Sequence, residues 1–145
     1  MAKALIIFAT RSGETEKIAG LIAEGIRFSG IEAAVMDVKD IKKESDLEGY
    51  DALILGAATY HGDMLQSMKT LLFLAEKASL EGVVGGAFGA FGWSGEAPDR
   101  IFDTMKHIFK MNMVGAPLRL KSSLLGGGIR MAQDYGRDIA KLISG

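Results

Sequence analysis

The sequence predicts an α/β protein in which helices cover both faces of a parallel sheet. Short, continuously apolar runs alternate along the 145 residues with longer stretches in which apolar residues recur every three or four positions. Continuous runs are typical of strands buried on both faces, and the longer spacing is typical of amphipathic helices. Because this alternation repeats about five times without a linker, residues 1–145 are expected to form one domain with right-handed crossovers.

Each expected element has its own local signal. Five strands are expected, at residues 4–9, 32–38, 52–57, 83–91 and 116–120. Four helices are expected, at residues 14–28, 64–75, 98–109 and 129–143. In the first helix Ile18, Ile22 and Ile26 form one apolar stripe, and Pro98 suits the first turn of the third helix.

The composition excludes several classes of site. The chain has no cysteine, which rules out disulfides, thiol catalysis, iron–sulfur clusters and cysteine-bound zinc, and its two histidines are too few for a histidine-rich metal site. With 17 basic and 18 acidic residues the net charge is −1, so the sequence indicates neither a nucleic-acid surface nor a membrane surface. The N-terminus leads directly into the first strand, and a cytoplasmic protein is expected.

In a doubly wound sheet a ligand binds beyond the carboxyl ends of the strands, where the winding direction reverses. The loop after the first strand consists of Thr10, Arg11, Ser12, Gly13, Glu14 and Thr15. Its hydroxyls, its glycine and the N–H groups that open the next helix are the ingredients of a phosphate cradle. The same residue types are favoured in an ordinary helix N-cap, so this loop alone leaves both interpretations open.

The loop after the fourth strand carries the only tryptophan of the chain. It consists of Phe91, Gly92, Trp93, Ser94 and Gly95. An indole held between small residues on a loop is suited to stacking on a flat ligand. The alternative is an aromatic side chain that simply covers the end of the sheet.

The loop after the third strand consists of Ala58, Thr59, Tyr60, His61 and Gly62. Tyr60 or His61 is placed to cover the opposite face of the same ligand. Gly62 reaches positive φ without penalty, so its peptide unit can change orientation. Taken alone, His61 is better explained as a partly exposed loop histidine.

Together the three loops resemble those of the short-chain flavodoxin family. The first loop follows that family's phosphate motif, which runs Ser or Thr, any residue, Ser or Thr, Gly, any residue, Thr. Residues 89–96 resemble the loop around the isoalloxazine ring, most closely in the flavodoxin module of flavodiiron proteins, here standing alone. The likeness spans the whole chain. It implies a flavodoxin-like three-layer sandwich with a five-stranded parallel sheet in the order 2-1-3-4-5, without the insertion that long-chain flavodoxins carry in the fifth strand.

The resemblance also implies that FMN is the cofactor and that no metal is needed. It assigns the FMN phosphate to Thr10, Ser12, Gly13 and Thr15, together with the backbone of Arg11 and Glu14. It places Trp93 on one face of the flavin, with Phe91, Gly92, Ser94 and Gly95 along the polar edge. It places Tyr60 or His61 on the other face, with Ala58 and Thr59 in the same loop and Gly62 beside flavin N5.

The implied function is that of a flavoprotein in electron transport, which shuttles single electrons between redox partner proteins. Reductases and ferredoxin-like or di-iron acceptors are the expected partners, and a monomer is the expected state. Two features depart from the family pattern. Glu14 stands where many flavodoxins have Asn, and the chain is nearly neutral where flavodoxins tend to be strongly acidic.

Two other functions were weighed against electron transport. A receiver domain of the response-regulator type shares the fold but needs carboxylates at the ends of the first and third strands, where this chain has Ala9-Thr10 and Ala57-Ala58. A flavin-dependent oxidoreductase of the quinone or NAD(P)H dehydrogenase type needs space for a second substrate over the flavin. Two aromatic walls argue against that space, so an electron carrier is favoured over a turnover enzyme.

Overall fold

The computed structural model describes residues 2–10, 13–60, 63–90, 96–121 and 127–145, without the side chains of Tyr60 and Asp63. The strands are β1 Lys3–Ala9, β2 Glu32–Asp37, β3 Ala52–Ala57, β4 Thr59–Tyr60, β5 Asp63–Met64, β6 Val84–Ala90, β7 Asn112–Met113 and β8 Leu118–Leu120. The α-helices are α1 Glu14–Arg27, α2 Gln66–Ala75, α3 Glu96–His107 and α4 Gly128–Ser144. Two 3-10 turns, η1 Val38–Asp40 and η2 Glu44–Leu47, follow β2.

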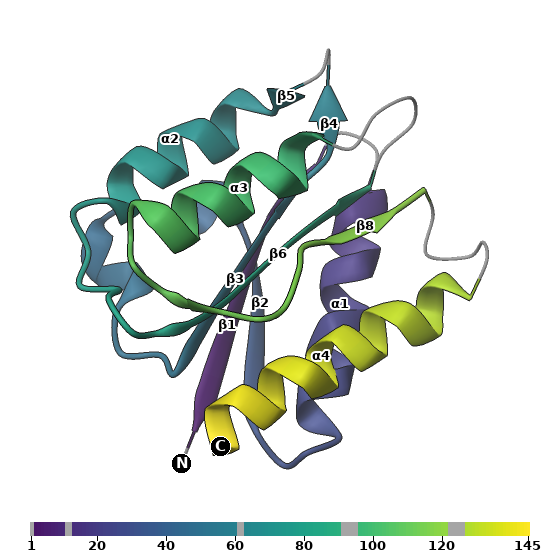
Figure 1. Cartoon of the computed structure of the whole chain (residues 1–145). Helices are drawn as coiled ribbons and strands as arrows, with labels where there is room; N and C mark the ends of the chain where they lie inside the picture. The colour runs from purple at the N-terminus through teal and green to yellow at the C-terminus, as the bar shows by residue number, and fades with distance from the viewer. Residues whose placement is uncertain (1, 11–12, 61–62, 91–95, 122–126) are drawn as a thin grey trace.

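The main sheet confirms the predicted strand order. Its strands run β2-β1-β3-β6, and β7 and β8 both pair with β6, so they are two pieces of the fifth strand. All of these pairings are parallel. Figure 1 shows α1 and α4 on one face of the sheet and α2 and α3 on the other, as a three-layer sandwich requires.

Several predicted boundaries were wrong by a few residues. The fifth strand was predicted as one stretch over residues 116–120, but it is split into β7 Asn112–Met113 and β8 Leu118–Leu120, with the exposed Gly115 and Ala116 in the break between them. The second helix begins at Gln66 instead of residue 64, because Met64 pairs with Thr59 in a β4–β5 hairpin that the sequence did not predict. The third helix begins two residues before Pro98 and ends at His107. At the end of the fourth strand, Phe91 lies outside the described residues.

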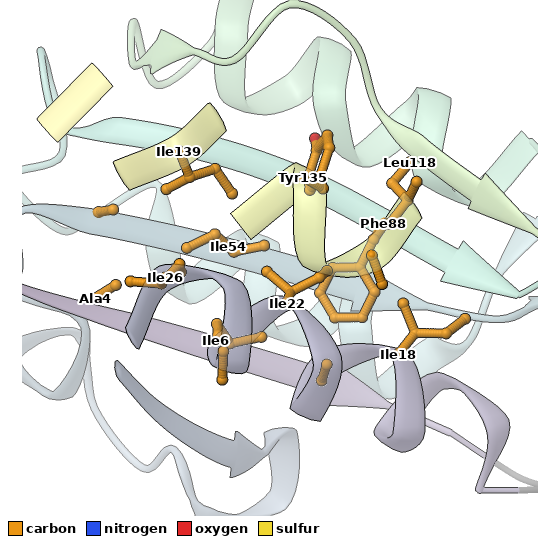
Figure 2. Close-up of a cluster of buried hydrophobic side chains, with 14 of the residues drawn as sticks. Ala4, Ile6, Ile18, Ile22, Ile26, Ile54, Phe88, Leu118, Tyr135 and Ile139 are labelled. Carbon is orange, nitrogen blue, oxygen red and sulfur yellow. The ribbon is translucent and has the colours of Figure 1, made fainter. Parts of the chain in front are cut away.

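Alternate side chains of each central strand enter different core layers. In β1, Ile6 packs with the α1–α4 layer and Leu5 with the α2–α3 layer, and both are fully buried. Figure 2 shows the first layer, in which Ile18 and Ile22 of α1 surround the ring of Phe88 from β6. Strands buried on both faces explain why the sequence shows continuous apolar runs. Within the described ranges, no helix has the length and apolar character needed to cross a membrane.

Tyr135 of α4 closes the gap in the fifth strand. Its buried hydroxyl lies 2.7 Å from the carbonyl oxygen of Ala116 and 3.1 Å from that of Ala87, and it accepts a 3.2 Å hydrogen bond from the Ala87 N–H. Ala87 lies in β6 between the stretches that pair with β7 and β8. The hydroxyl thus serves backbone groups that an uninterrupted fifth strand would otherwise pair.

Replacing Tyr135 with Phe is expected to lower the free energy of unfolding by about 1–3 kcal/mol, because buried backbone groups of Ala87 lose their partner. Burial raises the pKa of the Tyr135 phenol well above its ordinary value. The stability that depends on the neutral phenol is therefore complete below about pH 10 and is lost as the pH rises further. Denaturant unfolding between about pH 8 and 11 should show that Tyr135→Phe lacks this loss.

The matched control is Tyr50→Phe, which removes a hydroxyl from a half-buried ring away from the strand break. Its stability should follow the wild type at each pH. Equal stability of Tyr135→Phe and Tyr50→Phe would contradict the role of the Tyr135 hydroxyl.

Candidate functional site

The strand register brings three loops to one edge of the sheet. Ala9 at the end of β1 pairs with Ala57 at the end of β3, and Gly56 pairs with Phe88 of β6. Neighbouring strands lie about 4.8 Å apart, so the loops after β1, β3 and β6 begin within about 10 Å of one another. The three loops singled out in the sequence therefore start side by side at this edge of the sheet.

The structure describes part of the first two loops and none of residues 91–95. Among the predicted site residues it places Thr10, Gly13, Glu14, Thr15, Ala58, Thr59 and the backbone of Tyr60. The remaining ones lie outside the described residues: Arg11, Ser12, His61, Gly62, Phe91, Gly92, Trp93, Ser94 and Gly95. The geometry can therefore be followed in the first loop and at the bases of the other two.

Gly13 turns the chain from the first loop into α1. It is the N-cap residue and has φ 89°, a left-handed conformation that L-side chains rarely adopt. Its N–H donates to the Thr10 hydroxyl over 2.9 Å, and its carbonyl accepts the first helical bond, from the Lys17 N–H over 3.2 Å. Glycine provides no side chain to cap the first turn, so the N-terminal end of α1 faces the site with its backbone N–H groups.

Thr15 is the most informative residue of the site. It is fully buried in the first turn of α1, yet its hydroxyl oxygen has no hydrogen-bond partner among the described residues. Leaving a buried hydroxyl unsatisfied costs about 1–3 kcal/mol. A phosphate oxygen at the helix N-terminus would accept a hydrogen bond from this hydroxyl and from the backbone N–H groups together. The described residues of the first loop therefore fit the FMN phosphate.

Charge contributes little to this phosphate site within the described residues. Glu14 and Glu16 both lie in the first turn of α1, where carboxylates already use the positive end of the helix dipole. Among the described residues of this loop, the groups available to bind an anion are therefore hydroxyl and N–H groups. This is the structural counterpart of the departure at Glu14 noted in the sequence.

The described residues that flank the other two loops come into contact at the first turn of α3. The Ala97 N–H donates to the Thr59 hydroxyl over 3.0 Å, so α3 is capped by a residue that precedes it by 38 positions. Gly89 in β6 allows the close approach, because a Cβ at that position would collide with the Ala57 carbonyl oxygen and the ring of Pro98. The sequence predicted Thr59 as a cofactor-binding residue, and no local signal pointed to Ala97 as its partner.

A hollow of about 600 Å³ lies at the opposite, amino end of β1 and β2 and does not belong to this site. Both of its cations have partners: Lys3 Nζ lies 4.9 Å from the centre of the Tyr50 ring, and Arg27 donates to the Ala33 carbonyl over 2.7 Å.

Comparison with known proteins gives consistent similarities. Residues 6–132 match the family model described as Flavodoxin. A solved flavodoxin from the domain Archaea superimposes with a TM-score of 0.92, at 28% identity and with 99% of both chains covered. The type A flavoprotein fprA of Rhodobacter capsulatus is 29% identical over 145 residues, covering 97% of this chain. An NAD(P)H dehydrogenase (quinone) of Rhodopseudomonas palustris is 30% identical over 165 aligned positions, covering 94% of this chain and 81% of that protein.

The chain spans about a third of the length of the R. capsulatus relative, since the match covers 33% of that protein. The archaeal flavodoxin, by contrast, is matched over almost its full length. The similarity therefore extends over a complete solved flavodoxin and over one portion of a larger flavoprotein.

Replacing Thr15 with Val separates stability from phosphate binding. Val is nearly isosteric but has no hydroxyl. The free energy of unfolding of the FMN-free protein should therefore stay equal or rise by up to about 1 kcal/mol. FMN affinity should fall at least about tenfold, as expected for one lost hydrogen bond to a charged group. Affinity for riboflavin, which lacks the phosphate, should stay the same when both are measured by fluorescence titration.

Thr70→Val on the exposed face of α2 is the matched control, because the Thr70 hydroxyl bonds only within its helix, to the Gln66 carbonyl. It should bind both flavins as the wild type does. If Thr15→Val lost affinity for riboflavin and FMN equally, the Thr15 hydroxyl would not be a phosphate ligand.

Proposed function

The chain belongs to the flavodoxin family, whose members bind FMN and transfer electrons, and on this premise we propose that it shuttles single electrons between protein partners. The observation that carries the proposal is the buried Thr15 hydroxyl, which has no partner among the described residues and lies in the first turn of α1. Burying this hydroxyl without a partner destabilises the FMN-free protein. A ligand that supplies a hydrogen-bond acceptor at this helix end explains why the hydroxyl is there.

The first loop and the N-terminus of α1 form the phosphate-binding half of the proposed site. Thr10 uses its hydroxyl to hold the Gly13 N–H, so it shapes the loop. Gly13, Thr15 and the N–H groups of the first turn then contact the phosphate, together with Ser12 and the backbone of Arg11 and Glu14. Oriented N–H and O–H dipoles replace the water around the phosphate.

The loops after β3 and β6 form the half of the proposed site that binds the isoalloxazine ring. Trp93 stacks on one face of the isoalloxazine ring, and Tyr60 or His61 covers the other, with Gly62 beside flavin N5. FMN supplies the redox chemistry, and the protein excludes water and sets the potential. The register of β3 and β6 supports this arrangement, because the two loops start from adjacent strands, and Thr59 of one loop contacts Ala97 just after the other.

We propose a carrier in preference to a turnover enzyme. The quinone dehydrogenase relative aligns over 165 positions, more than the 145 residues of this chain, so it contains insertions that this chain lacks. The archaeal flavodoxin, by contrast, is matched over 99% of each chain. Reductases and ferredoxin-like or di-iron acceptors are the proposed partners of a monomer, and a cytoplasmic location stays a prediction from the sequence.

Purification of the chain tests the proposal directly. We expect a yellow protein that releases FMN on denaturation, and whose potentiometric titration shows two separate one-electron steps. Incubation with NADH or NADPH and a quinone should give no turnover above that of free FMN. A protein that neither carries FMN nor binds added FMN would contradict the family function, and rapid turnover would favour the oxidoreductase.

Trp93→Ala tests the ring half separately. Loss of the indole should weaken binding of FMN and of riboflavin alike by about 1–3 kcal/mol, the value expected for stacking and buried aromatic area. Isothermal titration of the FMN-free protein measures both affinities. Phe73→Ala is the control, because Phe73 is 70% exposed on α2, outside the three loops, and its loss should leave both affinities unchanged. Unchanged affinities in Trp93→Ala would place the indole outside the site.

A further inference from the structure

We propose that the Thr59 hydroxyl is a positioning group that fixes the two ring-binding loops relative to each other through the first turn of α3. This inference rests on the proposed function, because the two loops matter together only if they enclose one ring. It assigns Thr59 a role through a neighbouring element, whereas the sequence assigned it to the cofactor itself.

The joint is a single directional contact at the bases of both loops. The Thr59 hydroxyl accepts from the Ala97 N–H over 3.0 Å, and the contact is partly buried. Thr59 directly precedes Tyr60, and Ala97 follows Gly95 by two residues. One hydrogen bond therefore links the two loops at their bases. Thr59 lies next to Tyr60, the candidate for one wall, and Ala97 lies just after the loop that carries Trp93.

Apolar packing surrounds this bond. Met64 pairs with Thr59 across the β4–β5 hairpin, and Met64 and Ala97 are both buried in the α2–α3 core layer. The close contact of Gly89 with Ala57 and Pro98 holds α3 against the ends of β3 and β6. Apolar contacts tolerate small sliding movements, whereas a hydrogen bond weakens steeply when its geometry changes. The Thr59–Ala97 bond is thus the contact that sets the register of α3 against the hairpin.

Loss of this bond has a defined local effect. Without the hydroxyl, the Ala97 N–H at the start of α3 loses its side-chain acceptor among the described residues, as when a helix loses its N-cap. The first turn of α3 and the loop before it then become free to shift relative to the hairpin. The phosphate loop is carried by β1 and α1 and is not part of this joint. The protein should therefore bind the isoalloxazine ring more weakly, while the phosphate's contribution to FMN affinity should stay the same.

The test compares Thr59→Val, which removes the acceptor, with Thr59→Ser, which keeps it. We expect Thr59→Val to bind FMN and riboflavin about tenfold more weakly, with the ratio of the two affinities unchanged, and Thr59→Ser to bind as the wild type does. Thr104→Val is the matched control, because it makes the same change on α3 at a hydroxyl that donates only to the Arg100 carbonyl of its own helix.

A second measurement does not depend on flavin. Amide hydrogen exchange of the FMN-free chain should show Ala97 protected in the wild type and in Thr59→Ser, and exchanging rapidly in Thr59→Val, while the α1 amides stay unchanged. Thr59→Ala replaces Thr59→Val in both measurements if the valine variant does not fold.

The outcomes distinguish the inference from the proposed function. If the wild-type chain binds no flavin, the proposed function fails, and protection of Ala97 that depends on Thr59 would then show only a structural joint. If the wild type binds FMN but Thr59→Val binds it equally well, the inference is overturned. A selective loss of FMN over riboflavin in Thr59→Val would also overturn it, because that result would make Thr59 a phosphate ligand.

Discussion

The parallel pairing of β1, β3 and β6 is the constraint on which the whole site depends. Each pair is in register near its carboxyl end, with Ala9 beside Ala57 and Gly56 beside Phe88. Loops that are far apart in the sequence therefore start at neighbouring points. A slip of one residue in either pairing would turn the buried side chains to the opposite face of the sheet, so the two core layers enforce the register. The packing that fixes the strand register therefore also fixes where the three loops begin.

Most of the fold could be predicted because each large element has a periodic signal. The continuous run of β3 and the apolar stripe of α1 appear in the structure within one residue of the expected ends. The β4–β5 hairpin was missed because two-residue strands are too short to show any period. The break between β7 and β8 was missed because it depends on Tyr135, a residue of α4 that contacts Ala87 across the layers.

The candidate site could be predicted as a set of loops, but its contacts could not. The hydroxyls and the glycine of the first loop indicated a phosphate site, and the structure adds that Thr15 is fully buried. That burial comes from the packing of α1 on the sheet, which no local pattern encodes. The contact between Thr59 and Ala97 is likewise invisible in the sequence, because it joins segments 38 positions apart whose meeting depends on the crossover through β6.

Because Tyr135 bridges the split fifth strand, the chain has a natural point for grafting. Gly115 and Ala116 are exposed between β7 and β8, and apart from its chain neighbours no described residue comes within 4 Å of a Cβ built on Gly115. A reporter domain or affinity peptide spliced after Gly115 would project into solvent, since exposed connections accept added length at little cost in loop entropy. Ala116 and its bond to Tyr135 would be retained, so the inserted segment would be displayed without changing the contact that bridges the strand break.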